Sequence, residues 1–221
     1  MKRSNAFALG IDGIRFYANP HPGKLYVVEG PDRVGKSTIA ESLAMTLQLK
    51  KLGYGTGASM EAKQLLHSFL DTDVAFENPA MVQEAFNVVR HQGQAKIEKV
   101  LASGTSVLLD RNWLSMLVYG QVAGLELDYL LSNSRHFIVP DAILLVTRKK
   151  PLPGREEKRN KYDDDLEFLS KVTRLYYWLL EWWKQHVPTI PIGMVELDGC
   201  DIPTSLKRAE RRFLQLISDS Q

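Results

Sequence analysis

The segment from Gly30 to Ser37 reads G-P-D-R-V-G-K-S and fits the pattern G-x-x-x-x-G-K-S/T. Glycines in such a segment let backbone N–H groups turn inward around phosphate oxygens. A helix that starts at the end of the segment adds its dipole and its free N–H donors. The Lys36 ammonium is expected to bridge the outer phosphates, and the Ser37 hydroxyl can ligate Mg²⁺. The pattern therefore predicts a binding site for a nucleoside triphosphate.

Asp110 and Arg111 follow a short apolar run that is typical of a strand buried on both faces. Doubly wound sheets bind ligands at the carboxyl ends of their strands, and these side chains are expected there. The Asp110 carboxylate can hold Mg²⁺ or its water shell, and the planar Arg111 guanidinium can fork onto a phosphate. The alternative is a surface ion pair with no ligand.

Phe86 and Arg90 lie one helical turn apart, and therefore on one face, in a segment with the pattern of a long helix. A nucleobase site needs a flat ring for stacking and donors for the carbonyl oxygens of the base. This pair supplies both. The alternative is that Phe86 packs in the core and Arg90 is solvated.

Strand and helix patterns alternate along the chain, as in a parallel sheet with right-handed crossovers. Apolar runs predict strands over residues 24–29, 106–109, 142–146 and 194–197. Helical spacing of apolar residues predicts helices over 36–51, 81–101 and 166–183, and a last helix with Leu206, Ala209, Phe213 and Leu216 inward. Gly53 is read as a helix stop, and residues 54–79 show no clear pattern. The expected fold class is α/β, a doubly wound parallel sheet with helices on both faces.

The composition limits the kinds of protein that this chain can be. Its 221 residues are 44% hydrophobic, enough for one sizeable domain at 23–221 after an N-terminal extension, 1–22, with a hairpin around Ile11 to Gly13. The net charge of +2 does not favour nucleic-acid or membrane binding, and no run is apolar enough for a membrane span. The single cysteine, Cys200, excludes a disulfide framework and a cysteine-rich zinc site. We expect a soluble, cytoplasmic protein.

Several motifs together resemble the thymidylate kinase family. The segment from Glu29 to Thr38 is similar to the family's E-G-x-D-(R/G)-x-G-K-(S/T)-T loop. Further similar stretches are Phe86 to Arg90, Val107 to Arg111, Ser115 with Tyr119, Pro140 to Val146, and Val195 to Gly199. The resemblance covers residues 24–217, nearly the whole chain after the extension.

The resemblance implies a P-loop nucleoside monophosphate kinase-like fold with a mobile lid at about residues 151–165. It also implies transfer of the γ-phosphoryl group of Mg·ATP to a pyrimidine deoxynucleoside monophosphate, with dTMP giving dTDP as the first expectation. Such a transfer depends on positioning and charge stabilisation, for which the expected catalytic residues are Lys36, Arg33 and Arg111. A homodimer that packs the 81–101 and 113–124 regions is implied as well.

The resemblance further implies the contacts of each substrate. The residues expected at ATP are Gly30, Asp32, Arg33, Val34, Gly35, Lys36, Ser37 and Thr38, with Arg155 of the lid on adenine. Those expected at the acceptor are Asp32, Phe86, Arg90, Arg111 and Tyr119, and those at Mg²⁺ are Ser37 and Asp110. Asp32 would accept from the sugar 3′-hydroxyl, and the Tyr119 ring beneath the sugar would select deoxyribose.

One departure from the family pattern leaves the acceptor open. The family usually has an arginine after its second strand that holds the acceptor phosphate, but this sequence has no arginine between Arg33 and Arg90. The cation nearest in sequence to the position of this missing arginine is Lys63. Two alternatives therefore remain: a kinase for a deoxynucleoside or a modified nucleotide, and a non-catalytic nucleotide-binding protein.

Overall fold

A computed structural model of the chain describes residues 6–8, 15–53, 55–134, 136–153, 161–187 and 190–218. Its main sheet has five parallel strands: β3 (Leu25–Glu29), β4 (Lys50–Gly53), β5 (Val107–Asp110), β6 (Ala142–Thr147) and β7 (Ile192–Glu196). The strands lie in the order β4-β5-β3-β6-β7, so the sheet grows outward from β3 in both directions. This is the doubly wound arrangement expected from the sequence.

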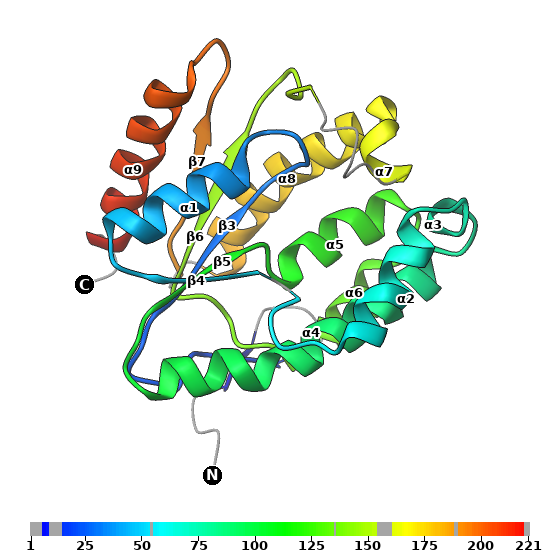
Figure 1. Ribbon diagram of the computed structural model, residues 1–221, viewed down its shortest axis with the longest axis horizontal. Helices are drawn as coiled ribbons and strands as arrows, with labels where there is room; N and C mark the ends of the chain where they lie inside the picture. The colour runs from blue at the N-terminus through cyan, green and yellow to red at the C-terminus, as the bar shows by residue number, and fades with distance from the viewer. Residues whose placement is uncertain are drawn as a thin grey trace.

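Helices cover both faces of the main sheet (Figure 1). On one face lie α1 (Lys36–Thr46) and α9 (Ile202–Ser218), which share a buried apolar cluster with β3, β5, β6 and β7. On the other face lie α4 (Pro79–Ala102), α5 (Trp113–Val122) and α8 (Leu166–His186). Shorter helices complete this second layer: α2 (Met60–Leu70), α3 (Val74–Glu77), α6 (Leu127–Ser134) and α7 (Lys161–Asp164).

Helix α5 is the most enclosed helix of the second layer. Its residues from Trp113 to Val118 are all buried, and it contacts α4, α6 and α8. The sequence of this run has no regularly spaced polar residues, which is typical of a helix that is covered on all sides. Little of α5 is therefore exposed, and the homodimer that the resemblance implies stays a prediction.

The strand register brings three loops to one edge of the sheet. Val28 of β3 pairs with Asp110 of β5, and Asp110 pairs on its other side with Gly53 of β4. Because the strands are parallel, the segments that follow them leave from the same edge. The loop from Gly30, the turn at Asp110 and Arg111, and the segment after Gly53 are thus neighbours.

The sequence prediction was wrong at the second strand. The helix expected over 36–51 ends at Thr46, and Gly53 closes strand β4 rather than a helix. Gln48 turns the chain with a φ of 54°, and the Leu49 N–H donates to the Ala44 carbonyl, 2.9 Å away. β4 lies at the sheet edge, where lysines are tolerated, so its K-K-L-G sequence lacks the apolar run of an inner strand.

The extension contributes a small second sheet. Strands β1 (Ala6–Ala8) and β2 (Arg15–Tyr17) pair antiparallel, while the turn expected at Ile11 to Gly13 lies outside the described residues. The Val139 N–H donates to the Tyr17 carbonyl at 2.8 Å, and the Asn19 amide donates to Asp141 at 2.8 Å. The end of the extension is therefore fastened to the segment before β6.

Only the two ends of the expected lid belong to the described part of the chain. Residues 151–153 and 161–165 are described, but Arg155 and its neighbours at 154–160 are not. Among the helices that the structure describes, none has the length and apolar character needed to cross a membrane.

Candidate active site

The phosphate-binding loop connects β3 to α1. Gly30 and Gly35 have φ values of 142° and 95°, which side chains rarely allow, and a Cβ on Gly30 would lie 2.0 Å from the Val146 carbonyl oxygen. The first helical hydrogen bond runs from the Ile39 N–H to the Gly35 carbonyl, so the N–H groups of the preceding turn have no acceptor within α1. Ser37 and Thr38 are exposed beside them. This loop fits a triphosphate.

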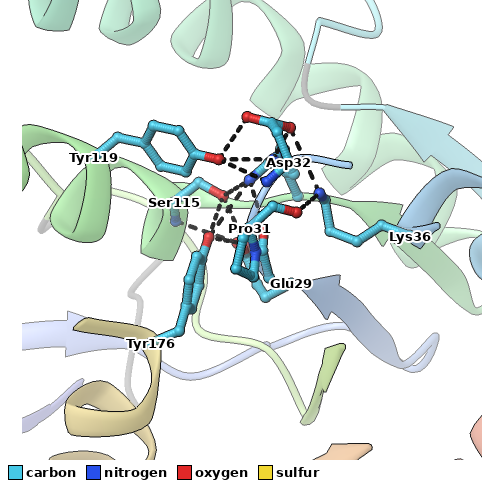
Figure 2. A network of polar contacts seen from close by, with 9 residues as sticks. Glu29, Pro31, Asp32, Lys36, Ser115, Tyr119 and Tyr176 are labelled. Atoms are coloured by element: carbon cyan, nitrogen blue, oxygen red, sulfur yellow. Dashed lines mark hydrogen bonds and ion pairs between the residues drawn. The ribbon is translucent and has the colours of Figure 1, made fainter. Parts of the chain in front are cut away.

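Lys36 turns back over the loop. It is buried, its Nζ donates to the Pro31 carbonyl, and it lies 3.6 Å from Asp32 (Figure 2). Burial and the nearby Arg111 cation lower the pKa of Lys36 to about 8, although Asp32 and Asp110 oppose them. Lys36 is therefore a cation at neutral pH. An incoming phosphate could replace the Pro31 carbonyl as the hydrogen-bond acceptor of its Nζ.

Asp32 is the meeting point of three side chains. It forms ion pairs with Arg111 and Lys36, and the Tyr119 hydroxyl donates to its Oδ2 at 2.5 Å. Figure 2 shows Tyr119 and Lys36 approaching Asp32 from opposite sides. Burial raises the pKa of Asp32, but the two cations outweigh burial and hold it well below its usual range. Asp32 is therefore a carboxylate at any physiological pH.

Arg111 joins the end of β5 to the phosphate-binding loop. Its backbone has a φ of 68°, and its Nη1 donates to the Gly30 carbonyl at 3.0 Å and to Ser115 Oγ at 2.9 Å. Its Nη2 donates to Asp32 and, at 3.2 Å, to the Tyr119 hydroxyl. Both terminal nitrogens of the guanidinium, Nη1 and Nη2, thus have acceptors within the protein. The contact of Arg111 with a phosphate remains a prediction.

A buried carboxylate lies behind Arg111. Glu29, which is 0% exposed, accepts from the Asn112 N–H at 2.7 Å, from Ser115 Oγ at 2.6 Å and from the Tyr176 hydroxyl at 3.0 Å. Burying a charge without such partners is costly, so these bonds fix the turn that carries Arg111. The sequence did not assign Glu29 a role, and the helical spacing of Tyr176 indicated only core packing.

A cavity of about 170 Å³ opens beside this network. Asp32, Arg111, Ser115 and Tyr119 line one part of it, and Phe86 and Arg90 of α4 line another. The Arg90 guanidinium lies 4.9 Å from the centre of the Phe86 ring. All five residues expected at the acceptor therefore surround one space.

Gln83, Met116 and Tyr162 are among the lining residues that were not predicted from the sequence. Gln83 of α4 was expected only as part of a helix, Met116 lies in the continuous apolar pattern of α5, and Tyr162 lies in the expected lid, where only the charged residues were assigned a role. The Tyr162 hydroxyl donates to the Ala75 carbonyl at 2.7 Å, and its ring stacks on Phe168 at 4.6 Å. None of the three belongs to a motif that spacing alone could single out.

The residues expected at Mg²⁺ lie next to the phosphate-binding loop. Ser37 is exposed in the first turn of α1, and Asp110 ends β5, close enough to Lys36 to affect its pKa. Magnesium at phosphoryl-transfer sites uses one or two protein oxygens together with phosphates and water. Ser37 and Asp110 fit that donor set, and their role as ligands remains a prediction.

Arg33 connects the loop to the start of the expected lid. Its Nε donates to the Leu152 carbonyl at 2.7 Å, and the Leu152 N–H donates to the Arg33 carbonyl at 2.6 Å. The φ of 63° at Arg33 is part of this turn. The contact of Arg33 with ATP remains a prediction, and the contact of Arg155 falls outside the described residues.

The segment after β4 has a lysine close to it where the family arginine is missing. A Cβ on Gly55 would lie 3.5 Å from Lys63 Cε, so the Lys63 side chain reaches back over that segment from α2. The same segment adjoins Asp110 through the pairing of β4 with β5. Lys63 is thus a cation that the fold brings to the segment in which the family arginine is missing.

Comparison with known proteins agrees with the site. The thymidylate kinase family model matches residues 28–195. The chain is 28% identical over 169 residues to a thymidylate kinase from Desulfotalea psychrophila, covering 71% of this chain and 81% of that one. It is 26% identical over 175 residues to one from Arabidopsis thaliana, covering 74% of this chain. The match spans less than two thirds of the Arabidopsis protein, 64%.

Solved structures show the same fold. The thymidylate kinase structure from Candida albicans superposes with a TM-score of 0.71 at 22% identity, covering 89% of this chain and 92% of that one. The one from Ehrlichia chaffeensis gives a TM-score of 0.64 at 18% identity, covering 90% and 99%. Since the family model covers most of the chain, including the phosphate-binding loop and the cavity beside it, this protein belongs to the thymidylate kinase family.

Proposed function

We propose that this chain transfers the γ-phosphoryl group of ATP to dTMP, giving dTDP and ADP, with Mg²⁺ as the accompanying ion. The observation that supports this most is one cavity that joins a nucleobase-type wall to a charged wall. Phe86 and Arg90 form the first wall, and Asp32 and Arg111 form the second, directly beside the phosphate-binding loop. Family membership supports the same reaction.

The loop and its cations position the donor. Lys36 and the N–H groups at the start of α1 would hold the outer phosphates, with Ser37 and Asp110 at the magnesium ion, which supplies charge neutralisation when bound. Arg33 lies on the same loop and would add a second cation near the transferred group. Because little covalent chemistry falls to the protein, orientation and charge would account for the rate.

The other end of the cavity would hold the acceptor. Phe86 would stack on the base and Arg90 would donate to its carbonyl oxygen, since a guanidinium has donors only. The Asp32 carboxylate would accept from the sugar 3′-hydroxyl, with Tyr119 placed beside it by their hydrogen bond. Arg111 would meet the acceptor phosphate between the two substrates, with Lys63 as a second cation.

The test of this function is ADP release with Mg·ATP and one acceptor at a time. The proposal expects dTMP to stimulate ADP release far more than thymidine or the ribonucleotide UMP, with dTDP as the product. Preference for thymidine would instead support a nucleoside kinase, because the missing arginine leaves the phosphate with fewer cations. A cytoplasmic location, expected from the sequence, and a homodimer, implied by the family resemblance, remain parts of this proposal.

A further inference from the structure

The polar residues of the cavity differ in how they are satisfied. Asp32, Arg111, Ser115 and Tyr119 hydrogen-bond one another along the charged wall. Gln83 lies on α4, lines the same cavity and is only 4% exposed, yet its Nε2 has no hydrogen-bond partner in the described structure. Burying an amide donor without an acceptor is costly, so one use for a donor at a cavity is to bond an acceptor of the ligand there.

The position of Gln83 indicates that use. Gln83, Phe86 and Arg90 are spaced three and four residues apart, so they follow one another on a single face of α4. All three line the cavity. A base stacked on Phe86 would have Arg90 toward one side and Gln83 toward the other, one helical turn away in each direction.

The chemistry of a primary amide suits the edge of a pyrimidine. Thymine presents an N3–H donor flanked by two carbonyl acceptors, and an amide has both a donor and an acceptor. Arg90 can serve only one of the two carbonyl oxygens as a donor from its side. Helix α5 contributes Met116 and Gly120 to the cavity, which have no polar side-chain group. It also contributes Ser115 and Tyr119, whose hydroxyls already hydrogen-bond along the charged wall.

We propose, building on the proposed function, that the Gln83 amide reads the base of the acceptor: Nε2 donates to a carbonyl oxygen of thymine. Gln83 is then a binding residue that Arg90 does not duplicate. Nε2 has no partner among the described residues, and a carbonyl oxygen of the bound base would supply one.

The first test replaces the amide with an apolar group of similar length, in Gln83→Met. The KM for dTMP should rise roughly three- to tenfold, the effect of one neutral hydrogen bond, while the KM for ATP stays the same. The melting temperature should hold or rise, because the variant removes a buried unsatisfied donor. An unchanged KM for dTMP would overturn the proposal, whatever the melting temperature does.

A matched control is Gln94→Met on the same helix. The Gln94 amide donates to Glu98 at 2.9 Å and does not line the cavity. This variant should leave the KM for dTMP unchanged. An equal rise in both variants would mean that any loss of an amide from α4 disturbs the site, and it would contradict a specific contact at Gln83.

The second test identifies the contact on the base, using 2-thio-dTMP and 4-thio-dTMP. A thione sulfur is a weaker hydrogen-bond acceptor than a carbonyl oxygen. If Gln83 contacts the altered position, the analogue has already lost that hydrogen bond, so Gln83→Met should not lower its affinity further. The other analogue should lose affinity additively with the variant. Additive losses for both analogues would overturn the proposal. Turnover of dTMP by the unaltered chain is measured first and tests the proposed function alone.

Discussion

The guanidinium of Arg111 donates to the carboxylate of Asp32, and this ion pair joins the end of β5 to the phosphate-binding loop at the wall of the cavity. Lys36 Nζ lies 3.6 Å from Asp32 Oδ1, the oxygen that Arg111 also contacts. One anion therefore orients two cations toward the region between the two proposed substrate sites. It also offsets part of the repulsion between the two cations, through which Arg111 still lowers the pKa of Lys36.

The ion pair makes Arg111 the most sensitive residue for the acceptor. Arg111→Ala removes a charge-assisted contact of about 1.5–3 kcal/mol and leaves Asp32 with one cation fewer, facing a substrate dianion. The KM for dTMP should rise by at least roughly ten- to a hundredfold. Steady-state kinetics at saturating ATP measures it. The matched comparison is Lys63→Ala: a larger effect there than at Arg111 would assign the phosphate to Lys63.

Lys36 and Arg33 are expected to act on the rate. Lys36→Ala and Arg33→Ala should each lower kcat by roughly a hundredfold or more, the usual effect of removing one oriented charge donor. Single-turnover measurements separate this loss from weaker ATP binding. If Arg33→Ala keeps the original kcat, its contact with Leu152 is a structural link to the lid and the catalytic assignment is wrong.

Phe86 and Arg90 should affect one substrate only. Phe86→Ala and Arg90→Ala remove the stacking ring and the donor group from the nucleobase wall, so each should raise the KM for dTMP by roughly tenfold. The affinity for ATP should not change, since the phosphate-binding loop is untouched. Were both variants to retain the original KM for dTMP, this face of α4 would serve packing rather than recognition.

The lowered pKa of Lys36 predicts a pH dependence. Its charge in the free protein is lost as the pH rises through about 8 rather than through 10.5, so kcat/KM for ATP should fall above pH 8. At saturating ATP the phosphates favour the charged form, and kcat should fall at a higher pH. The Lys36→Arg variant keeps its charge in this pH range, so the fall in kcat/KM near pH 8 should be absent from whatever activity it retains. A flat profile up to pH 10 would contradict this assignment.

Much of the fold follows from apolar patterns, but the edge strand β4 does not. The runs before Asp110 and after Asp141 identify inner strands, because both faces of such strands are covered. β4 was missed because an edge strand buries only Leu52, and its lysines resemble the end of the preceding helix. The turn at Gln48 has no glycine to mark it.

The residues of the site also divide into those that the sequence identified and those that it did not. Motifs identified Lys36, Asp32 and Arg111, since their chemistry depends on spacing within one loop or one strand end. Glu29 and Tyr176 act through a contact between elements that are 147 residues apart, and Gln83 is distinguished only by its burial at the cavity. A buried carboxylate, a helical tyrosine and a helical glutamine have common structural roles, so only their contacts and burial in the fold reveal a place at the site.

The most direct test of the central claim is the acceptor dependence of ADP release by the unaltered chain. ADP is measured with Mg·ATP alone and after addition of dTMP or thymidine, and the product is identified as a mono- or diphosphate. We predict slow release without an acceptor, strong stimulation by dTMP with formation of dTDP, and little stimulation by thymidine. Equal ADP release with and without dTMP, or faster phosphorylation of thymidine than of dTMP, would contradict the account.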